Sequence, residues 1–396
     1  MKAVLSRFGL NLLLVGLPAA LIGATADKTP PVQPKSVAGA VKPFVDDGTL
    51  AGAVVLVANK DKVLTVESIG WADIAAKLMM PIDALFWIAS MSKPITAAAL
   101  MMLVDEGKVK LDDPVEKYIP EFKNMQVPDE KPEKGKTSAK FRKPSRPMTV
   151  REVLSHTSGL PFGSPQEKTI DIMPLKDAVL SYTKNPLLHD PGTGYRYSNA
   201  GINTAGRIIE IASGMPYEEF LDKRLFGPLG MKDTTFWPSE EQAKRLAKSY
   251  KPGKDKKGLE LTTIGALKYP LTSKTDRYAC PGGGLFSTAG DCGIFCQMLL
   301  NGGEYKGKRY LSEAAVKELS SRQTAKNFKD SYGLGFAVDG DGFGHGGAYA
   351  TSMRIDRKHG LVTVWMVQQS GGFPGNGGKS QGAFRKAAEE MYGASK

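Results

Sequence analysis

Ser90 and Lys93, in the segment Ser90-Met91-Ser92-Lys93, have the residue types and the spacing that acyl-transfer chemistry requires. Residues three apart share one face of a helical turn, so their side chains can meet. A serine hydroxyl is a weak nucleophile until a base takes its proton, and a desolvated lysine amine is such a base. Burial lowers the pKa of a lysine, by as much as ~3–5 units when it is complete. The pair therefore predicts a serine nucleophile with a lysine base.

The residues around this pair predict that Ser90 lies at the N-terminus of a buried helix. An apolar approach, residues 85–89, precedes it, and a long apolar stretch, residues 94–104, follows it. Pro94 fits only in the first turn of a helix, because proline has no N–H to donate. The positive end of that helix would stabilise an oxyanion developing at Ser90.

Strands at both ends of the chain, with helices between them, are the elements that must position Ser90. The β-rich runs lie at 53–58 and 63–68, joined by a hairpin pattern at 59–62, and at 332–338, 348–356 and 361–368. Helical spacing and capping patterns predict helices at 149–159, 199–212, from 216, and at 288–300, 312–321 and 380–392, with a surface loop at 122–148. The pattern predicts one sheet assembled from the two termini, with a helical region inserted.

The first 26 residues have the composition of an export signal. Lys2 and Arg7 precede an apolar core, residues 10–22, and Ala24-Thr25-Ala26 provides a small-residue cleavage site. The core is shorter than a ~20-residue membrane span, which favours cleavage after Ala26 over a retained anchor. We expect a periplasmic or secreted protein with a flexible segment at 27–40, one catalytic domain at 41–396, and no transmembrane segment after cleavage.

Charge and cysteine content exclude several function classes. The net charge of +12 falls to +10 once Lys2 and Arg7 are removed, and the remaining lysines are scattered, as on a solvated surface. Because no aromatic residues interleave with them and no motif accompanies them, we expect no nucleic-acid partner. The three cysteines, Cys280, Cys292 and Cys296, allow at most one disulfide, and the sequence leaves open whether it forms. Cys292 and Cys296 are expected to act as small apolar residues. His189 and His359 show no metal-ligand spacing.

Two further segments carry groups that an acyl-transfer site needs. Tyr197-Ser198-Asn199 follows a turn-rich stretch and precedes a predicted helix. A phenol can exchange protons with a leaving group, and an amide can bind both a substrate carbonyl and the lysine. His345-Gly346-Gly347-Ala348 lies at the start of a predicted strand. Its glycines let a substrate approach the backbone closely, where a strand N–H can act as an oxyanion donor.

These three motifs, in this order, resemble the β-lactamase and penicillin-binding serine hydrolase superfamily. The resemblance is strongest to its AmpC-like branch, which includes DD-peptidases and family VIII esterases, and it extends from about Val41 to Tyr392. The sequence around the motifs also matches this branch, at residues 86–93, 153–160, 191–193 and 283–287. The resemblance implies an α/β (α+β) fold in which helices flank an antiparallel sheet beside an inserted helical region, with the site in the cleft between them.

The resemblance also implies a role for each motif residue. Ser90 would be the nucleophile, Lys93 its base and Tyr197 a proton shuttle, with no metal and no cofactor. Asn199 would bind substrate, together with the segment that begins at His345. The backbone N–H groups of Ser90 and Ala348 would form the oxyanion hole. His156, in the Leu-Ser-His-Thr-Ser-Gly segment, is expected to make structural hydrogen bonds rather than to act as a second base.

The third motif departs from the Lys-Thr-Gly that is typical of AmpC-like β-lactamases. There, a cation and a hydroxyl help to hold the acidic group of a β-lactam. His345 offers no permanent charge and Gly346 no hydroxyl. We therefore expect a small carboxylic ester as the substrate. A β-lactam or a D-amino-acid cell-wall peptide is the alternative, and so is a penicillin-acylated sensor that does not turn over. The sequence leaves the oligomeric state open.

Three other patterns compete with Ser90 and are weaker. Ser181 and Lys184 repeat the spacing, but they lie at a polar helix end before Asn185-Pro186, where the lysine would be solvated. Residues 378–382 fit the nucleophile elbow of α/β-hydrolases, but no histidine follows Ser380, so that triad cannot form. The same segment lacks the first glycine of a P-loop, because residue 373 is Phe. Ser380 is expected to cap the last helix.

Overall fold

A computed structural model describes residues 36–129 and 140–393 of the chain. The predicted export signal, most of the predicted flexible segment and residues 130–139 of the predicted surface loop lie outside these residues. Within them, no helix is long and apolar enough to cross a membrane. Cys280, Cys292 and Cys296 are buried free thiols.

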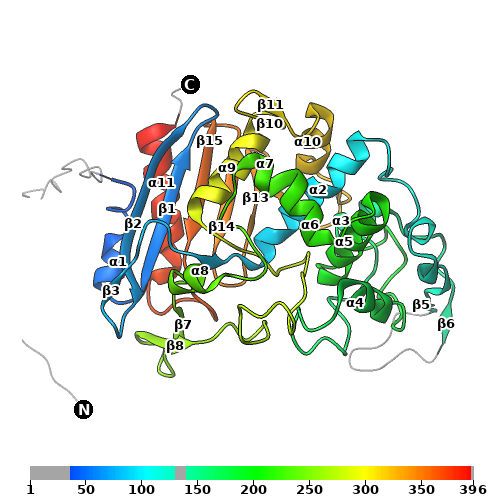
Figure 1. Cartoon of the computed structure of the whole chain (residues 1–396), viewed down its shortest axis with the longest axis horizontal. Coiled ribbons are helices and arrows are strands. Elements are labelled where there is room, and N and C mark those ends of the chain that lie inside the picture. The colour runs from blue at the N-terminus through cyan, green and yellow to red at the C-terminus, as the bar shows by residue number, and fades with distance from the viewer. Residues whose placement is uncertain (1–35, 130–139, 394–396) are drawn as a thin grey trace, which may run out of the picture. The chain divides into compact units, whose positions relative to one another are not determined.

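A seven-stranded antiparallel sheet forms the centre of the fold (Figure 1). Its strands, in spatial order, are β12 (Ala337–Val338), β13 (Gly342–Gly346), β14 (Ser352–Asp356), β15 (Leu361–Met366), β1 (Gly52–Ala58), β2 (Val63–Asp73) and β3 (Leu78–Met79). The N-terminal β1 pairs with the C-terminal β15, with Val55 opposite Trp365. The sheet is therefore assembled from both ends of the chain, as the sequence predicts.

Both faces of the sheet are covered by helices, which explains the uninterrupted apolar run in β1. Val54 and Leu56 belong to the core on the side of α2 (Ser92–Asp105) and α9 (Ala289–Leu300). Val55 and Val57 pack in a second cluster with α11 (Ser380–Tyr392), close to α1 (Lys42–Asp46). The hairpin between β1 and β2 turns at Asn59, whose Oδ1 accepts from the N–H groups of Asp61 and Lys62.

The inserted helical region packs against α2. It contains α3 (Val150–Leu154), α4 (Leu175–Tyr182), α5 (Asn199–Ser213), α6 (Tyr217–Leu221), a π-helical turn (Asp222–Phe226), α7 (Gly227–Leu229) and α8 (Glu240–Lys244). α10 (Glu313–Ser320), which follows the insertion in the chain, also contacts α2. Short paired strands complete the fold: β4 (Phe86–Trp87) with β9 (Phe286–Ser287), β5 (Val127–Pro128) with β6 (Phe141–Arg142), β7 (Ser249–Pro252) with β8 (Leu259–Thr262), and β10 (Glu304–Tyr305) with β11 (Lys308–Arg309).

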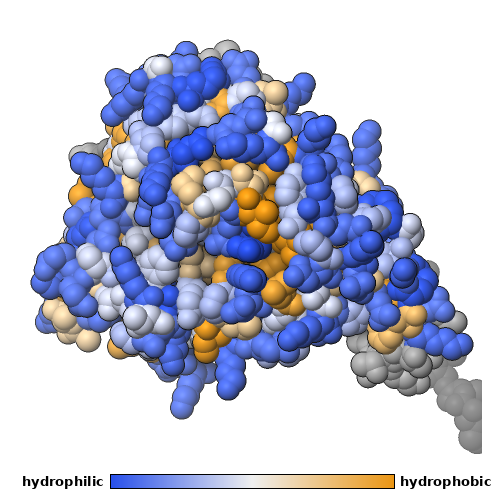
Figure 2. Space-filling model, turned by 45° about the vertical axis from the view of Figure 1, so that its right-hand side comes forward, coloured by the Kyte–Doolittle hydropathy of each residue, from blue (hydrophilic) through white to orange (hydrophobic). Residues whose placement is uncertain are grey.

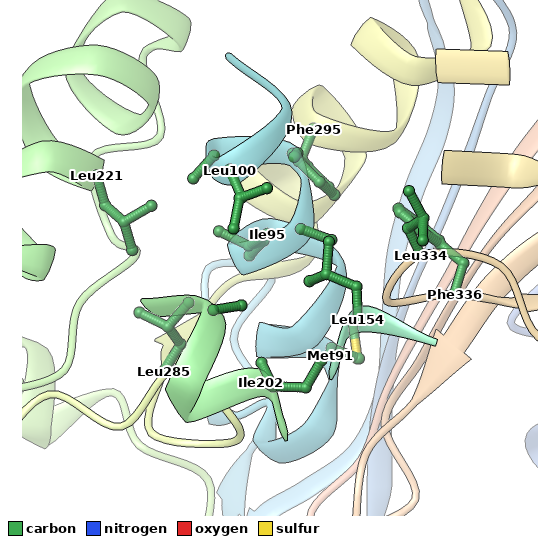
Figure 3. Close-up of a cluster of buried hydrophobic side chains, with 14 of the residues drawn as sticks. Met91, Ile95, Leu100, Leu154, Ile202, Leu221, Leu285, Phe295, Leu334 and Phe336 are labelled. Carbon is green, nitrogen blue, oxygen red and sulfur yellow. The ribbon is translucent and has the colours of Figure 1, made fainter. Parts of the chain in front are cut away.

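Helix α2 is the central element of the core. Every residue from Ser92 to Leu103 is buried, which is what a helix with apolar residues on all sides requires. Figure 3 shows Met91, Ile95 and Leu100 among side chains from the insertion, from α9 and from the segment that precedes β12. Burying each such side chain contributes roughly 1.5–3 kcal/mol. By contrast, Figure 2 shows a face covered largely by hydrophilic side chains, with apolar ones gathered near its centre.

The structure corrects several predicted boundaries. The strand predicted at 348–356 begins only at Ser352, and of the run at 332–338 only Ala337–Val338 is paired as a strand. The helix that begins after the Thr149 cap ends at Leu154 rather than near Gly159, because His156 takes a left-handed conformation with φ +61°. Ser380 does not cap α11. Its hydroxyl donates to the carbonyl of Gly377 at 2.6 Å, and Lys379 is the cap residue.

Candidate active site

Ser90 lies in a 3₁₀ turn, Ala89–Met91, immediately before α2. Ala89 has a φ of +46°, a conformation that costs a non-glycine residue about 1–3 kcal/mol and is found mainly where neighbours enforce it. Here the Ser92 hydroxyl enforces it by donating to the Ala89 carbonyl at 2.7 Å and accepting from the Leu285 N–H at 3.2 Å. Pro94 falls in the first turn of α2, as predicted.

Lys93 is completely buried, and its amine meets three oxygen atoms. Nζ lies 3.1 Å from Ser90 Oγ, 2.7 Å from Asn199 Oδ1 and 2.6 Å from the Gly282 carbonyl. Burial lowers the pKa of Lys93 to about 7. A neutral amine has two hydrogens and one lone pair, and the two carbonyl-type oxygens can only accept. The hydrogens therefore go to Asn199 and Gly282, which leaves the lone pair for the Ser90 hydroxyl.

Tyr197 completes the group around the lysine. Lys93 Nζ lies 4.7 Å from the centre of the Tyr197 ring. Burial raises the pKa of Tyr197 to about 12, although a hydrogen bond with Ser90 opposes that rise. The phenol therefore keeps its proton at neutral pH and can donate it. Phe162 is stacked against the same ring at 6.4 Å and remains 53% exposed, so it offers an apolar surface beside the phenol.

The start of α5 positions Asn199. Ser198 caps the helix by accepting from the Gly201 N–H at 3.0 Å, and it donates to the Pro161 carbonyl at 2.6 Å. The Asn199 N–H donates to the Phe162 carbonyl at 2.9 Å. Asn199 is thereby fixed as the first residue of the helix, with its amide oxygen on Lys93.

His345 is the last residue but one of strand β13, and both of its ring nitrogens are engaged. Nδ1 lies 2.7 Å from the Gly346 carbonyl, and Nε2 lies 2.9 Å from the hydroxyl of Tyr332. A carbonyl can only accept, so Nδ1 carries the hydrogen and Nε2 accepts from Tyr332. Burial, together with the charge of Lys93, lowers the pKa of His345 to about 3. The ring is therefore neutral at physiological pH and has no free nitrogen.

Gly347 and Ala348 lie in the turn between β13 and β14, not on a strand as predicted. The Gly347 N–H donates to the Thr351 carbonyl at 2.7 Å, and the Ala350 N–H donates to the Gly347 carbonyl at 3.0 Å. The Ala348 N–H takes part in neither bond. A Cβ at Gly347 would lie 2.5 Å from the Ile88 carbonyl, so only glycine lets the turn approach the segment that carries Ser90.

His156 packs against two tyrosine rings and accepts a hydrogen bond. Its ring lies between those of Tyr197 and Tyr332, with centres 4.5 and 4.6 Å away, and Nδ1 accepts from the Ser198 N–H at 3.3 Å. Burial holds the pKa of His156 well below its usual value. The ring contacts neither Ser90 nor Lys93 by a hydrogen bond, in keeping with the structural role expected for it.

Two participants were missed by the sequence analysis. Tyr332 was assigned only to a strand, although its hydroxyl binds His345. Gly282 acts through its backbone carbonyl, for which no side-chain motif exists. It is held in place by Asn203, whose Oδ1 accepts from the Gly282 N–H at 2.9 Å. Asn203 stands one helical turn after Asn199, a spacing that could have signalled a shared role.

The competing serines do not resemble a nucleophile. Ser181 is buried, and its hydroxyl bonds to Ser164 Oγ at 2.7 Å and the Ala178 carbonyl at 2.6 Å, while Lys184 is exposed.

His359 pairs with Asp356 at 2.9 Å. With Glu389 these two form the one group among residues 36–129 and 140–393 whose atoms could surround a metal ion, and it contains none of the residues around Ser90.

Comparisons with known proteins show which proteins the chain is similar to. Residues 37–384 match the family model described as Beta-lactamase. Esterase EstB of Burkholderia gladioli is 32% identical over 217 residues, or 52% of this chain and 51% of EstB. The D-alanyl-D-alanine-carboxypeptidase/endopeptidase AmpH of Escherichia coli is 28% identical over 267 residues, or 66% of this chain and 60% of AmpH.

A likeness in fold extends over nearly the whole described chain. The solved structure of EstCE1, described as a hydrolase with promiscuous acyltransferase activity, matches with a TM-score of 0.73. The match covers 89% of this chain and 97% of EstCE1 at 22% identity. At that identity the likeness concerns the fold, an antiparallel sheet flanked by helices with an inserted helical region.

Proposed function

Because this chain belongs to the Beta-lactamase family and is a serine hydrolase, we propose that it cleaves uncharged carboxylic esters through an acyl-enzyme on Ser90. The neutral, fully engaged ring of His345 is the observation that carries this choice. An acidic substrate group would find no cation and no free N–H at that position. The exposed ring of Phe162 beside Tyr197 favours an apolar acyl or alcohol group.

In the acylation step, the lone pair of Lys93 takes the Ser90 proton while the Ser90 oxygen attacks the ester carbonyl. The oxyanion receives the N–H groups of Ser90 and Ala348, each of the kind worth about 10²–10³-fold in kcat. As the C–O bond of the ester breaks, Tyr197 gives its proton to the departing alkoxide and regains one from the Lys93 ammonium. The alcohol leaves, and the acyl group stays on Ser90.

Deacylation repeats these transfers with water in place of the alcohol. The amine of Lys93, neutral again, takes a proton from water through Tyr197, and the resulting hydroxide attacks the acyl carbonyl. Ser90 leaves as the alkoxide and is reprotonated, so that a carboxylic acid is released and the resting state is restored. General acid–base help of this kind contributes about 10²–10⁴-fold. Every step uses side chains of this chain, so the proposal includes no metal or cofactor.

A D-amino-acid peptide or a β-lactam is the second candidate, because AmpH is among the relatives and carries carboxypeptidase activity in its name. A penicillin-acylated sensor that traps the acyl group is compatible with the same residues. We also propose that residues 1–26 direct export to the periplasm or beyond. In this proposal residues 27–40 form a flexible segment before the catalytic domain at 41–396.

The test is steady-state hydrolysis of p-nitrophenyl butyrate by wild type, Ser90→Ala and the matched control Ser181→Ala. Ser90→Ala should lower turnover by about 10⁴-fold or more, because the nucleophile is lost, and Ser181→Ala should retain it. A penicillin and a D-alanyl-D-alanine peptide are assayed in parallel. Turnover that survives in Ser90→Ala would falsify the assignment of the nucleophile. A single burst without turnover would support the sensor instead.

A further inference from the structure

A cavity lies beside strand β13, on the face of the sheet that is turned toward α11. The cavity has a volume of about 220 Å³, and its lining includes Asp339, Gly344, His345, Ser352, Arg354 and Arg385. Side chains alternate along a strand. Phe343 and Met353 point into the core on the α2 side, so Gly344 and Arg354 face α11.

The sequence of β13, Gly-Phe-Gly-His-Gly, explains why this space is not filled. Glycine occupies each position of the strand that faces α11, so the backbone itself forms the floor of the cavity. Strand β13 thus separates two environments. The ring of His345 extends toward Tyr332 and Tyr197 on the Ser90 side, although the residue also lines the cavity, and Gly344 and Gly346 border the cavity on the other side.

The two arginines at the cavity differ in their partners. Arg354 is paired with Asp339, through contacts of 2.6 and 3.1 Å. Arg385 of α11 donates to the Ser352 hydroxyl at 3.0 Å and forms no ion pair within the described part of the chain. Burial and the positive charge of Arg354 lower the pKa of Arg385, and the nearby carboxylates of Glu389, Asp339 and Asp356 oppose that shift. Among the described residues, the guanidinium has one hydroxyl as its hydrogen-bond partner, which leaves N–H groups free to bind an anion.

We infer that this cavity binds a small monocarboxylate, with its carboxylate on Arg385 and Ser352. Arg385 is the arginine at the cavity without an ion pair in the described part of the chain, and one carboxylate would supply that partner, whereas a dianion would place excess charge beside Asp339, Asp356 and Glu389. A guanidinium presents parallel N–H groups that suit the two oxygens of a carboxylate. Ala337, which pairs with Gly344, borders the cavity and provides apolar contact for a short hydrocarbon chain. The site is separate from Ser90 and does not rest on the proposed hydrolysis.

The experiment is calorimetric titration of the full chain with sodium butyrate at low ionic strength. Wild type, Arg385→Met and the matched control Arg309→Met are compared. Arg309 lies on β11 beside Glu304, outside the cavity, and its replacement removes the same charge. We expect saturable binding by wild type and Arg309→Met, and at least about tenfold weaker binding by Arg385→Met, the loss of one charge-assisted contact. Butyramide, the uncharged analogue, should not bind to wild type.

Ser90→Ala distinguishes this site from the hydrolytic one, because it should bind butyrate as wild type does. Circular dichroism and thermal unfolding of Arg385→Met establish that the variant is folded, and Arg385→Lys, which keeps the charge, should recover part of the affinity. Equal affinity of wild type and Arg385→Met for butyrate would overturn the inference. So would binding of butyramide as tight as that of butyrate, or binding of inorganic phosphate tighter than that of butyrate.

Discussion

At the scale of single residues, the protonation of Lys93 controls the proposed chemistry. With a pKa of about 7, a large fraction of the Lys93 amine is neutral at physiological pH, whereas an exposed lysine would be almost wholly charged. Only the neutral amine can take the Ser90 proton. Tyr197, with a pKa raised to about 12, stays protonated over the same range.

We therefore predict one ascending limb in the pH profile of kcat/KM for a neutral ester. Activity should rise about tenfold per pH unit below about pH 7 and level off above it, because Lys93 loses its proton there. The neutral His345 should contribute no limb in this range. Initial rates between about pH 5 and pH 9 would measure this. A limb centred above pH 9 would contradict a buried lysine base.

His345→Lys should change substrate preference. A lysine at this position would offer a cation where the histidine offers a neutral ring with both nitrogens engaged. The ratio of kcat/KM for a carboxylate-bearing ester to that for a neutral ester should rise by about tenfold, the value of one charge-assisted hydrogen bond. Both esters are assayed with wild type and the variant. An unchanged ratio would show that position 345 does not face the substrate.

At the scale of elements, the turn between β13 and β14 connects the sheet to the nucleophile. Gly347→Ala would place a Cβ 2.1 Å from Thr351 Oγ1 and 2.5 Å from the Ile88 carbonyl, so the turn must move away. We predict a loss of kcat of about 10²-fold, the value of one misplaced oxyanion donor, with a smaller change in KM. Gly340→Ala, where nothing lies within 4 Å of the added Cβ, is the control. Equal activities of the two variants would argue against Ala348 as a donor.

Strand β13, which precedes this turn, was harder to predict from the sequence than β1 or α11. β1 and α11 could be predicted nearly to the residue, because an apolar run and a helical period are local signals. β13 carries three glycines, and what makes it a strand is its pairing with β12 and β14. The motif residues of the site were found for their chemistry. Tyr332 and Gly282 were not, since one acts through a tertiary contact with His345 and the other through its backbone.

At the scale of the whole molecule, burying Lys93 at the site lowers the free energy of unfolding of the fold. Lys93 titrates near 7 when buried, and near ~10.4 in an unfolded chain. Between these values the unfolded chain binds more protons, so the free energy of unfolding rises with pH across this window. Below it, the penalty is present in full, at roughly 4–5 kcal/mol. The antiparallel sheet and the buried helix α2 must supply that much before any net stability remains.

Lys93→Met removes this titration and should separate stability from activity. Turnover should be lost, while the free energy of unfolding of the variant, relative to wild type, should fall by roughly 4 kcal/mol between about pH 7 and about pH 10, as the wild-type penalty disappears. Other titrating groups cancel in this difference. Loss of the donor to Asn199 and Gly282 lowers the variant by a constant amount, about 1–3 kcal/mol per unpaired oxygen. Denaturant unfolding of both proteins at several pH values measures the difference, with Lys184→Met, at an exposed lysine, as the control. A difference that stays constant across the window would mean that Lys93 keeps an ordinary pKa and reaches solvent.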